Sequence, residues 1–360
     1  MLSFLFQKIC IQKESVYNWL IRCLFDFSNS QRVHLPVKHI LFINWNGKIG
    51  DAVISSFLYR ELRRAYPGII ISVVTTEELE TLYLKYYGVD HVHIVRRCSL
   101  WELYQLTRYI KNVDTVVPLI GLLDLRHLFF LWRLHPRNVF GLDDSLCMNN
   151  GIFYKQAQGL IIHDIFREIL QQIGISEFND QYIIPSRQEP FSRPVWDIVF
   201  NPFGSRQDKS LAFAKAVSLL QMIGQEYPSL RIGLMYSPST LNAAMEIENA
   251  VQKTNITVIP NTRTFFDAMD DIRNAAVVIS VDTALVHIAA GLKKKTIAFY
   301  YRPENEFNCW LPRRDAKVKL IYSDGPAKYR LKDMNRFENS SVLNAIHVIM
   351  KQERDRSDSR

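Results

Sequence analysis

The chain has 360 residues, of which 48% are hydrophobic and 22% are charged. At about 150 residues per domain this length predicts two domains, and the supply of apolar residues excludes disorder as the main state. The net charge of +8 indicates an acidic partner. Nucleic acid is disfavoured as that partner, because the sequence has no zinc-finger spacing, aromatic RNA-binding motif or dense basic arm.

Residues 1–36 form a predicted N-terminal amphipathic extension. They mix Leu, Phe and Trp19 with basic side chains such as Lys8, Lys13 and Arg22. This pattern fits a helix lying on a membrane surface and fits equally well a helix packing on its own domain. A secretory signal is not expected, because no basic region precedes the short apolar run and no small-residue cleavage site follows it.

The sequence predicts no membrane span. The longest apolar stretch, residues 119–134, is interrupted by Asp124, Arg126, His127 and Arg133, whereas a spanning helix needs about 20 mostly apolar residues. Five Cys without a C-x-x-C pair favour a reducing compartment over a disulfide framework. We therefore predict a cytoplasmic protein that contacts the cytoplasmic face of the inner membrane peripherally.

Residues 37–186 are predicted to form the first domain. Short apolar runs alternate there with longer helical patterns, as in a parallel sheet covered by helices on both faces. The predicted strands are residues 39–44, 69–74, 91–95, 115–119 and 138–142. The predicted helices are residues 52–66, 77–87 and 100–111, with another between the last two strands.

Residues 194–345 are predicted to form the second domain, after a Pro-rich linker at 184–194 and before a charged tail at 346–360. The predicted strands are residues 195–201, 230–236, 256–260, 276–280 and 296–300, and the predicted helices are residues 211–227, 246–254, 265–274 and 283–291. The fold class is therefore α/β, with two doubly wound Rossmann-like domains. Two such domains are expected to face each other across a cleft that holds two substrates.

The first candidate site is the segment NWNGKIGDAV (44–53), which joins the first strand to the first helix. Gly47 and Gly50 allow tight backbone geometry and close approach of a ligand. Asp51 falls in the first helical turn, where the helix dipole favours its carboxylate. A plain helix cap is the alternative reading of Asp51. The segment lacks the full G-x-G-x-x-G dinucleotide pattern, which disfavours a hydride-transfer enzyme.

The second candidate site is NPFGSRQDKS (201–210), the first loop of the second domain. Gly204 and Ser205 can present backbone and hydroxyl donors to a phosphate, and Lys209 adds a positive charge. The alternative reading is a polar loop with a solvated lysine.

The third candidate site is ISVDTALVHIAAGLKKKTIAFY (279–300). A buried strand ends at Asp282, Thr283 and Ala284 open a helix, and His287 lies on its second turn. A helix N-terminus has spare N–H donors and a partial positive charge, so it can hold a pyrophosphate. For His287, a core histidine facing the sheet is an equally good reading.

No metal site or other catalytic motif is predicted. His91 and His93 share one face of a strand but have no third ligand at metal spacing. A nucleophile elbow and a phosphate-binding P-loop are both missing.

Together the three segments resemble the ADP-heptose:lipopolysaccharide heptosyltransferases, glycosyltransferase family 9. The resemblance runs over roughly residues 38–345, and D-T-x-L-x-H-x-A-A is its most specific part. His163, in IIHDIFREILQQIGI, resembles a further family position. The matching segments read ILFINWNGKIGDAVISSFLYRELRRAYP (40–67), FNPFGSRQDKSL (200–211) and ISVDTALVHIAAGLKKKTIAFY (279–300).

The resemblance implies a GT-B architecture and an inverting glycosyl transfer that uses no metal and no cofactor. It implies that Asp51 is the general base, on the acceptor side of the N-terminal domain. The C-terminal domain would hold the nucleotide sugar through Gly204, Ser205, Lys209, Asp282, Thr283, Ala284 and His287. Gly47, Gly50, Arg60, Arg63 and Arg64 are the predicted acceptor-side residues.

The resemblance predicts transfer of heptose from ADP-L-glycero-D-manno-heptose to a phosphorylated lipopolysaccharide or lipooligosaccharide core glycolipid. Some positions depart from the family pattern. Ala284 stands where many members have Gly, and Trp45 and Asn46 replace small or basic residues. No acid for the ribose can be assigned in residues 235–248. A UDP-N-acetylglucosamine donor, a protein acceptor and a non-catalytic binding subunit are the alternatives.

Overall fold

The computed structural model describes residues 19–30, 32–119, 123–142, 146–151, 160–186, 196–302, 310–324 and 333–357. The chain divides into two compact units, Met1–Gln181 and Tyr182–Arg360. The predicted linker lies mostly outside the described residues. No helix in the described part of the chain combines the length and apolar character needed to cross a membrane.

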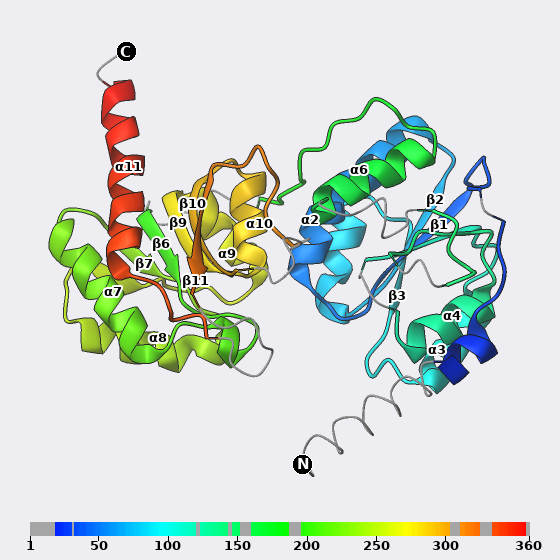
Figure 1. Cartoon of the computed structure of the whole chain (residues 1–360), viewed down its shortest axis with the longest axis horizontal. Coiled ribbons are helices and arrows are strands. Elements are labelled where there is room, and N and C mark those ends of the chain that lie inside the picture. The colour runs from blue at the N-terminus through cyan, green and yellow to red at the C-terminus, as the bar shows by residue number, and fades with distance from the viewer. Residues whose placement is uncertain are drawn as a thin grey trace, which may run out of the picture. The chain divides into compact units, whose positions relative to one another are not determined.

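The first unit is built on a five-stranded parallel sheet with the order β3-β2-β1-β4-β5. Helices α2 and α6 pack together on one face, and α3 and α4 on the other (Figure 1). The strands are β1 (His39–Asn44), β2 (Ile70–Thr75), β3 (His91–Ile94), β4 (Thr115–Pro118) and β5 (Asn138–Val139). The helices are α2 (Ile49–Ala65), α3 (Leu100–Tyr109), α4 (Leu125–Leu134) and α6 (Ile162–Gln172).

One predicted helix of the first unit takes a different form. Residues 77–87 form a 3₁₀ turn, η1 (Glu77–Leu79), followed by a π-helical turn, η2 (Leu82–Tyr86). The sequence supplies a helical apolar pattern, but Leu79, Leu82 and Tyr83 are all fully buried. The wider turn follows from packing these side chains beneath α2, where Tyr83 meets Tyr59 edge to face.

The second unit has a six-stranded parallel sheet with the order β11-β10-β9-β6-β7-β8. Its strands are β6 (Trp196–Asn201), β7 (Ile232–Leu234), β8 (Ile256–Val258), β9 (Ala275–Val281), β10 (Lys295–Tyr301) and β11 (Val318–Ser323). Its helices are η3 (Gln207–Lys209), α7 (Phe213–Glu226), η4 (Pro238–Thr240), α8 (Leu241–Val251), α9 (Phe265–Arg273), α10 (Ala284–Gly291) and α11 (Asn339–Ser357).

Two predictions for the end of the chain are wrong. The strand series does not close at residue 300, because β11 adds an edge strand beside β10. The predicted tail from residue 346 is not separate, because α11 runs from Asn339 to Ser357 and buries Ile346 and Ile349 in the core. Charged residues late in this helix hide the apolar positions on its inner face. The predicted helix at 246–254 also begins earlier, as α8.

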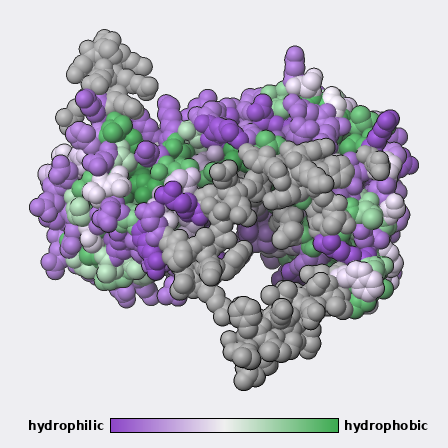
Figure 2. Space-filling view, viewed as in Figure 1, coloured by the Kyte–Doolittle hydropathy of each residue, from purple (hydrophilic) through white to green (hydrophobic). Residues whose placement is uncertain are grey.

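The N-terminal extension packs on its own unit over the residues that the structure describes. Residues 19–25 are helical, Ile21 is buried in the core, and Phe25 packs beside it. The opposite side of this short helix exposes Trp19 and Leu24. Figure 2 shows pale and hydrophobic side chains gathered where this helix, α3 and α4 lie in Figure 1.

Candidate functional site

Both sheets have the Rossmann strand order, and the candidate residues lie where that order reverses. In such sheets ligands bind beyond the carboxyl ends of the two strands at the reversal. In the first unit these strands are β1 and β4, and Asp51 follows β1. In the second unit they are β6 and β9, which Lys209 and Asp282 follow. Each unit therefore places its strongest sequence motif at the binding edge of its sheet.

The turn that presents Asp51 depends on Gly47. Its backbone has φ +64°, a conformation that L side chains rarely adopt, and an added Cβ would lie 2.8 Å from Oγ1 of Thr76. The Gly47 amide donates to the carbonyl of Asn44 at 3.1 Å. Asn44, which the sequence analysis missed, donates in turn to the hydroxyl of Tyr83 at 2.8 Å. A buried amide thus fixes the start of the turn.

Asp51 is not a helix cap. Lys48 occupies the N-cap position of α2 without a side-chain capping hydrogen bond, and Asp51 lies three residues later with only 4% of its surface exposed. Its Oδ2 atom is buried and has no hydrogen-bond partner among the described residues. Burial raises the pKa of Asp51 from its ordinary value of 3.8 to about 7, and the positive charge of Lys48 opposes that rise. A carboxylate with this pKa can both accept and release a proton near neutral pH.

A histidine and a carboxylate that the sequence analysis did not single out lie at the same edge of the first unit. Asp124 caps α4, and its Oδ1 lies 2.6 Å from Nδ1 of His127. The ring of Trp45, which follows β1, lies 4.3 Å from the His127 ring. Burial raises the pKa of Asp124, but the hydrogen bonds from His127 and Arg126 outweigh it and hold that pKa well below its ordinary value. The pair thus anchors Trp45 next to the Asp51 turn.

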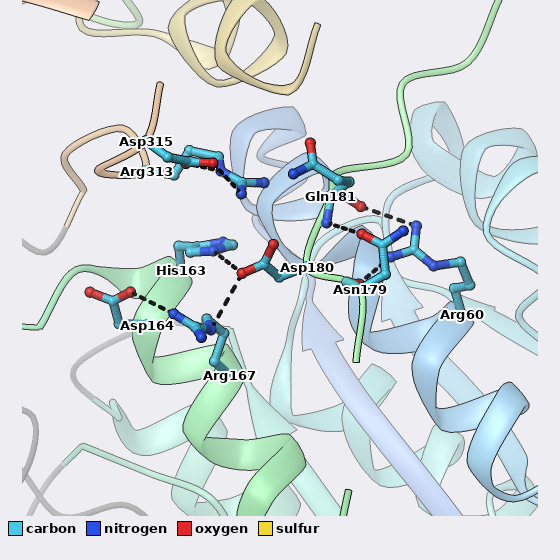
Figure 3. Close-up of polar contacts among 9 residues, drawn as sticks. All are labelled: Arg60, His163, Asp164, Arg167, Asn179, Asp180, Gln181, Arg313 and Asp315. Atoms are coloured by element: carbon cyan, nitrogen blue, oxygen red, sulfur yellow. Dashed lines mark hydrogen bonds and ion pairs between the residues drawn. The ribbon is translucent and has the colours of Figure 1, made fainter. Parts of the chain in front are cut away.

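The three predicted acceptor-side arginines have partners inside the first unit. Arg60 donates to the carbonyls of Asn179 and, at 3.1 Å, Gln181 (Figure 3). Arg64 donates to the carbonyl of Glu177. Arg63 pairs with Asp90 at 2.5 Å and also donates to the carbonyl of Ile69. These contacts fix the end of the first unit against α2, and an acceptor role for the three arginines stays a prediction.

A buried carboxylate holds two of these arginines in place. Glu61 is 1% exposed and lies 2.8 Å from both Nε of Arg60 and Nε of Arg64. On the neighbouring helix α6, His163 lies 3.3 Å from Asp180, which also contacts Arg167 (Figure 3). His163 thus anchors the segment that leaves the first unit. Arg313 and Asp315, also drawn in Figure 3, pair with each other within the second unit.

In the second unit, the structure brings two of the predicted donor-binding residues into direct contact. Nζ of Lys209 lies 2.7 Å from Oδ2 of Asp282, and their side chains are 30% and 18% exposed. The lysine comes from the loop after β6 and the aspartate from the loop after β9. Because β6 and β9 are neighbours in the sheet, residues 73 positions apart meet at its carboxyl edge.

Polar groups of the loop around Lys209 form hydrogen bonds with one another. The Gly204 amide donates to Oγ of Ser210 at 2.8 Å, so it is already occupied. A Cβ at Gly204 would lie 2.5 Å from the Lys209 carbonyl oxygen. Gly204 is therefore required for close packing of the loop, which differs from the donor role that the sequence predicts. Ser205 is exposed at the loop tip.

Asn201 and Ser280 connect the two loops, and the sequence analysis missed both. Asn201 is 4% exposed at the end of β6, and its Nδ2 donates to Oγ of Ser280 at 3.0 Å. Ser280 lies 3.2 Å from the Thr283 hydroxyl, which accepts the Leu285 amide and caps α10. The sequence signal that could have revealed Asn201 and Ser280 is a polar residue at the end of an apolar strand.

The first residues of α10 are partly exposed to solvent, whereas its second turn is buried. Asp282, Thr283 and Ala284 are partly exposed, whereas His287 is 4% exposed. Burial lowers the pKa of His287 to about 4, against the opposing charge of Asp282. His287 is therefore neutral at physiological pH, which agrees with the core reading.

Neither glutamate considered for the ribose shows a clear ligand position. Oε1 of Glu248 accepts the Val258 amide at 2.9 Å, so that carboxylate joins α8 to β8. Glu246 is exposed on α8.

Comparison with known proteins agrees with the predicted family. The model of glycosyltransferase family 9 (heptosyltransferase) matches residues 165–337. "Putative lipopolysaccharide heptosyltransferase 4" of Escherichia coli (strain K12) is 25% identical over 317 residues, which cover 83% of this chain and 84% of that protein. These matches support the predicted family, glycosyltransferase family 9.

Solved structures confirm the GT-B fold class of two Rossmann-like domains. The family 9 glycosyltransferase from Veillonella parvula has a TM-score of 0.68 at 16% identity and covers 90% of this chain and 100% of its own. E. coli heptosyltransferase WaaC with ADP has a TM-score of 0.64 at 17% identity, covering 86% and 99%. At these identities the match concerns the fold, so the roles of individual residues of this glycosyltransferase rest on its own geometry.

Proposed function

We propose that the chain is a family 9 glycosyltransferase that transfers heptose from ADP-heptose to a sugar hydroxyl of a lipopolysaccharide core glycolipid, with inversion at the anomeric carbon. The observation that carries the proposal is the Asp51 carboxylate. It is buried at the binding edge of a Rossmann sheet, has an oxygen without a partner, and has a pKa near neutral. A carboxylate in this state is a competent general base and has no evident structural task.

In the proposed reaction Asp51 accepts the proton of the acceptor hydroxyl. The hydroxyl oxygen then forms a bond to the anomeric carbon of the donor sugar. The bond from that carbon to the diphosphate oxygen breaks, and its electron pair leaves with ADP. Attack on the face opposite the leaving group gives inversion, and a base that gains its strength by burial favours the step that removes the proton.

The leaving diphosphate gains negative charge, and the second unit offers the groups to stabilise it. Lys209 supplies a full positive charge, and the N-terminus of α10 supplies the positive end of a helix dipole. In the structure, Lys209 lies against Asp282. Lys209 therefore exchanges a carboxylate partner for a diphosphate when the donor binds, and Asp282 keeps the ammonium in position beforehand.

The choice of ADP-heptose rests on relatives whose own ligands are known by name. WaaC was solved with ADP and with ADP-2-deoxy-2-fluoro heptose, and the curated relative is named for heptose transfer to lipopolysaccharide. The basic net charge suits a phosphorylated glycolipid acceptor. We propose further that the enzyme works at a membrane surface, where that acceptor resides.

The test is a transfer assay with purified enzyme, ADP-heptose or UDP-N-acetylglucosamine, and truncated core acceptors. We expect turnover with ADP-heptose alone. Turnover only with the UDP-sugar would replace the donor and leave the mechanism in place. Absence of turnover with every donor, together with an unchanged cellular phenotype in Asp51→Ala, would favour a binding subunit. A knockout strain with an unchanged glycolipid would indicate a protein acceptor.

A further inference from the structure

One face of the first unit carries an unusual set of exposed large side chains. It consists of the helix at 19–25 and the outer sides of α3 and α4, and we refer to it as the aromatic face. Its exposed members are Trp19 (63%), Leu20 (48%), Leu24 (65%), Leu100 (39%), Trp101 (69%) and Trp132 (40%). Three of the six Trp of the chain thus point to solvent here, although Trp is mostly buried in soluble domains.

Ring contacts join the aromatic face into one surface. Phe25 of the N-terminal helix meets Trp132 of α4 edge to face, with ring centroids 5.5 Å apart. The guanidinium of Arg133 lies over Tyr104 of α3 at 5.0 Å and over Trp132 at 6.0 Å. Tyr104 stacks on Trp101 at 5.5 Å. These contacts cross all three helices and make exposed Trp101 and Trp132 part of one continuous surface.

The surrounding charge is strongly basic. Segments 19–28, 96–112 and 124–137, which form this side of the unit, contain eight Arg or Lys and three acidic residues. These acids accept hydrogen bonds from backbone amides. Asp26 accepts the amides of Cys147 and Met148, and Glu102 accepts those of Arg96 and Arg97. The third, Asp124, pairs with His127 and Arg126.

With its acids engaged in this way, the face presents exposed Arg108 and Arg133 beside the tryptophans. Arg108 lies on the same side of α3 as Trp101 and Tyr104, because these positions are spaced by three and four residues. A surface of Trp, Leu and Arg with an excess of basic residues complements a layer that is apolar below and anionic above. A soluble protein partner would not require this combination of both properties.

We propose that the aromatic face binds the headgroup region of an anionic phospholipid bilayer. Trp and Tyr concentrate at the membrane–water interface, where ring and polar edge are both accommodated. Arg side chains extend from apolar surroundings to anionic headgroups, at about 1 kcal/mol for each basic residue near the surface. The inference rests on the proposed function, because it names the surface that makes the membrane contact proposed there. Lipid binding is measured without donor or acceptor, so lipid binding and glycosyl transfer can each fail without the other.

The location of the aromatic face suits a lipid-linked acceptor. Helices α2, α3 and α4 each follow a strand of the same parallel sheet, so all three begin at its carboxyl edge. Asp51 lies in the first turn of α2 and Trp101 in the first turn of α3. A bilayer against the aromatic face therefore brings its headgroups to the edge of the unit that carries the base.

The test uses the full-length protein and vesicles of phosphatidylethanolamine with or without phosphatidylglycerol. We expect sedimentation with the anionic vesicles and a weakening of about tenfold or more in the double variant Trp101→Ala and Trp132→Ala, since each ring buries apolar area in the interface. Phe213→Ala removes a 51% exposed aromatic side chain of the second unit and is the matched control, which should bind as the parent does.

Quenching of Trp fluorescence by brominated lipids shows which surface is in contact. We expect quenching that falls sharply when Trp19→Phe, Trp101→Phe and Trp132→Phe are combined, since Trp45 and Trp196 are 9% and 5% exposed. Unchanged quenching in that variant would overturn the proposal. So would self-association in place of vesicle binding, lost in the alanine variant, because the occupant would then be a second copy of the chain. Turnover of a soluble truncated acceptor should be unaffected.

Discussion

Each unit carries an aspartate at the carboxyl edge of its sheet, and the two carboxylates are in opposite states. Asp51 is almost fully buried, has an oxygen without a partner and has a raised pKa. Asp282 is partly exposed and lies 2.7 Å from the ammonium of Lys209. The role of an acid at this edge therefore depends on its solvation and its partner, and not on the fold alone.

On the proposed function, this difference corresponds to chemistry in one unit and electrostatic positioning in the other. A carboxylate that loses water without gaining a cation is destabilised in its charged form, so it tends to take up a proton. A carboxylate paired with a lysine stays charged and mainly orients its partner. If the comparison is right, removing the two acids should affect different steps, and the expected effects differ greatly in size.

The largest effect is expected for Asp51→Asn. Loss of a general base should lower kcat by roughly 10²–10⁴-fold, while the affinity for ADP, measured by calorimetry, stays the same. The same variant should gain stability above about pH 8, because it removes a buried charge whose pKa shift of about three units corresponds to up to about 4 kcal/mol. Thermal unfolding with and without the substitution measures this gain.

Glu61→Gln is the matched control for Asp51→Asn, since Glu61 is a buried acid of the same helix that pairs with Arg60 and Arg64. It should lower stability, because two arginines lose their charged partner. Equal destabilisation by both substitutions would show that Asp51 is a structural acid, and the comparison between the units would then fail.

The next effect is a dependence on pH. Asp51 must be deprotonated to act as a base, so kcat/KM should rise about tenfold per pH unit up to about pH 7 and level off above it. Stability should run the other way. Between pH values near 4 and 7 the folded state holds a proton that the unfolded state has released, so the free energy of unfolding falls as pH rises. A rate profile without an inflection near neutrality would contradict the role of Asp51.

Much of the fold could be predicted from the sequence, because buried parallel strands appear as continuous apolar runs. β1, β6 and β9 lie within one or two residues of their predicted bounds. The misses came from tertiary packing. β11 is only partly buried, as expected of an edge strand, and the sequence of α11 ends in a run of charged residues. Sequence periodicity cannot reveal that a helical pattern such as residues 77–87 will widen to fit three buried side chains beneath α2.

The motifs of the candidate site could be predicted from the sequence, but the contacts between their residues could not. Asp51, Lys209 and Asp282 were found because charged residues next to Gly or a strand end are conspicuous. The ion pair joining the last two depends on β6 and β9 being neighbours across 73 residues, which no local pattern encodes. The burial of Asp51 likewise depends on packing around the turn, so the sequence could not distinguish a base from a cap.

A moderate effect is expected for Lys209→Ala. Removing a charge-assisted phosphate contact should weaken ADP binding by about 1.5–3 kcal/mol, roughly 10- to 150-fold. Part of that loss comes from Asp282, which would face the diphosphate without its cation. Adding Asp282→Asn should therefore restore part of the affinity, and calorimetry of the single and double variants measures the coupling.

Lys294→Ala is the control for Lys209, because Lys294 is a half-buried lysine of the same unit that donates to the carbonyls of Arg273 and Ala275. ADP affinity should not change in this variant. If Asp282→Asn weakens ADP binding further in the absence of Lys209, Asp282 contacts the donor directly, and its assignment as a positioning residue is wrong.

The smallest effect is expected for Asn201→Ala, which tests whether the second unit works by prearranged loops. The substitution removes the amide that joins the ends of β6 and β9, which should lower the stability of the unit by about 1–3 kcal/mol. ADP affinity should fall only a few-fold, because Lys209 and the N-terminus of α10 remain.

Asn255→Ala provides the control. Asn255 donates to the carbonyls of Tyr227 and Leu230, but it precedes β8 at the amino-terminal edge of the sheet. Both variants should unfold at lower temperature in calorimetric scans, and only Asn201→Ala should bind ADP less well. Equal ADP affinity in the two variants would mean that the loops order around the donor when it binds, and the contrast between a reactive unit and a prearranged one would have to be abandoned for the second unit.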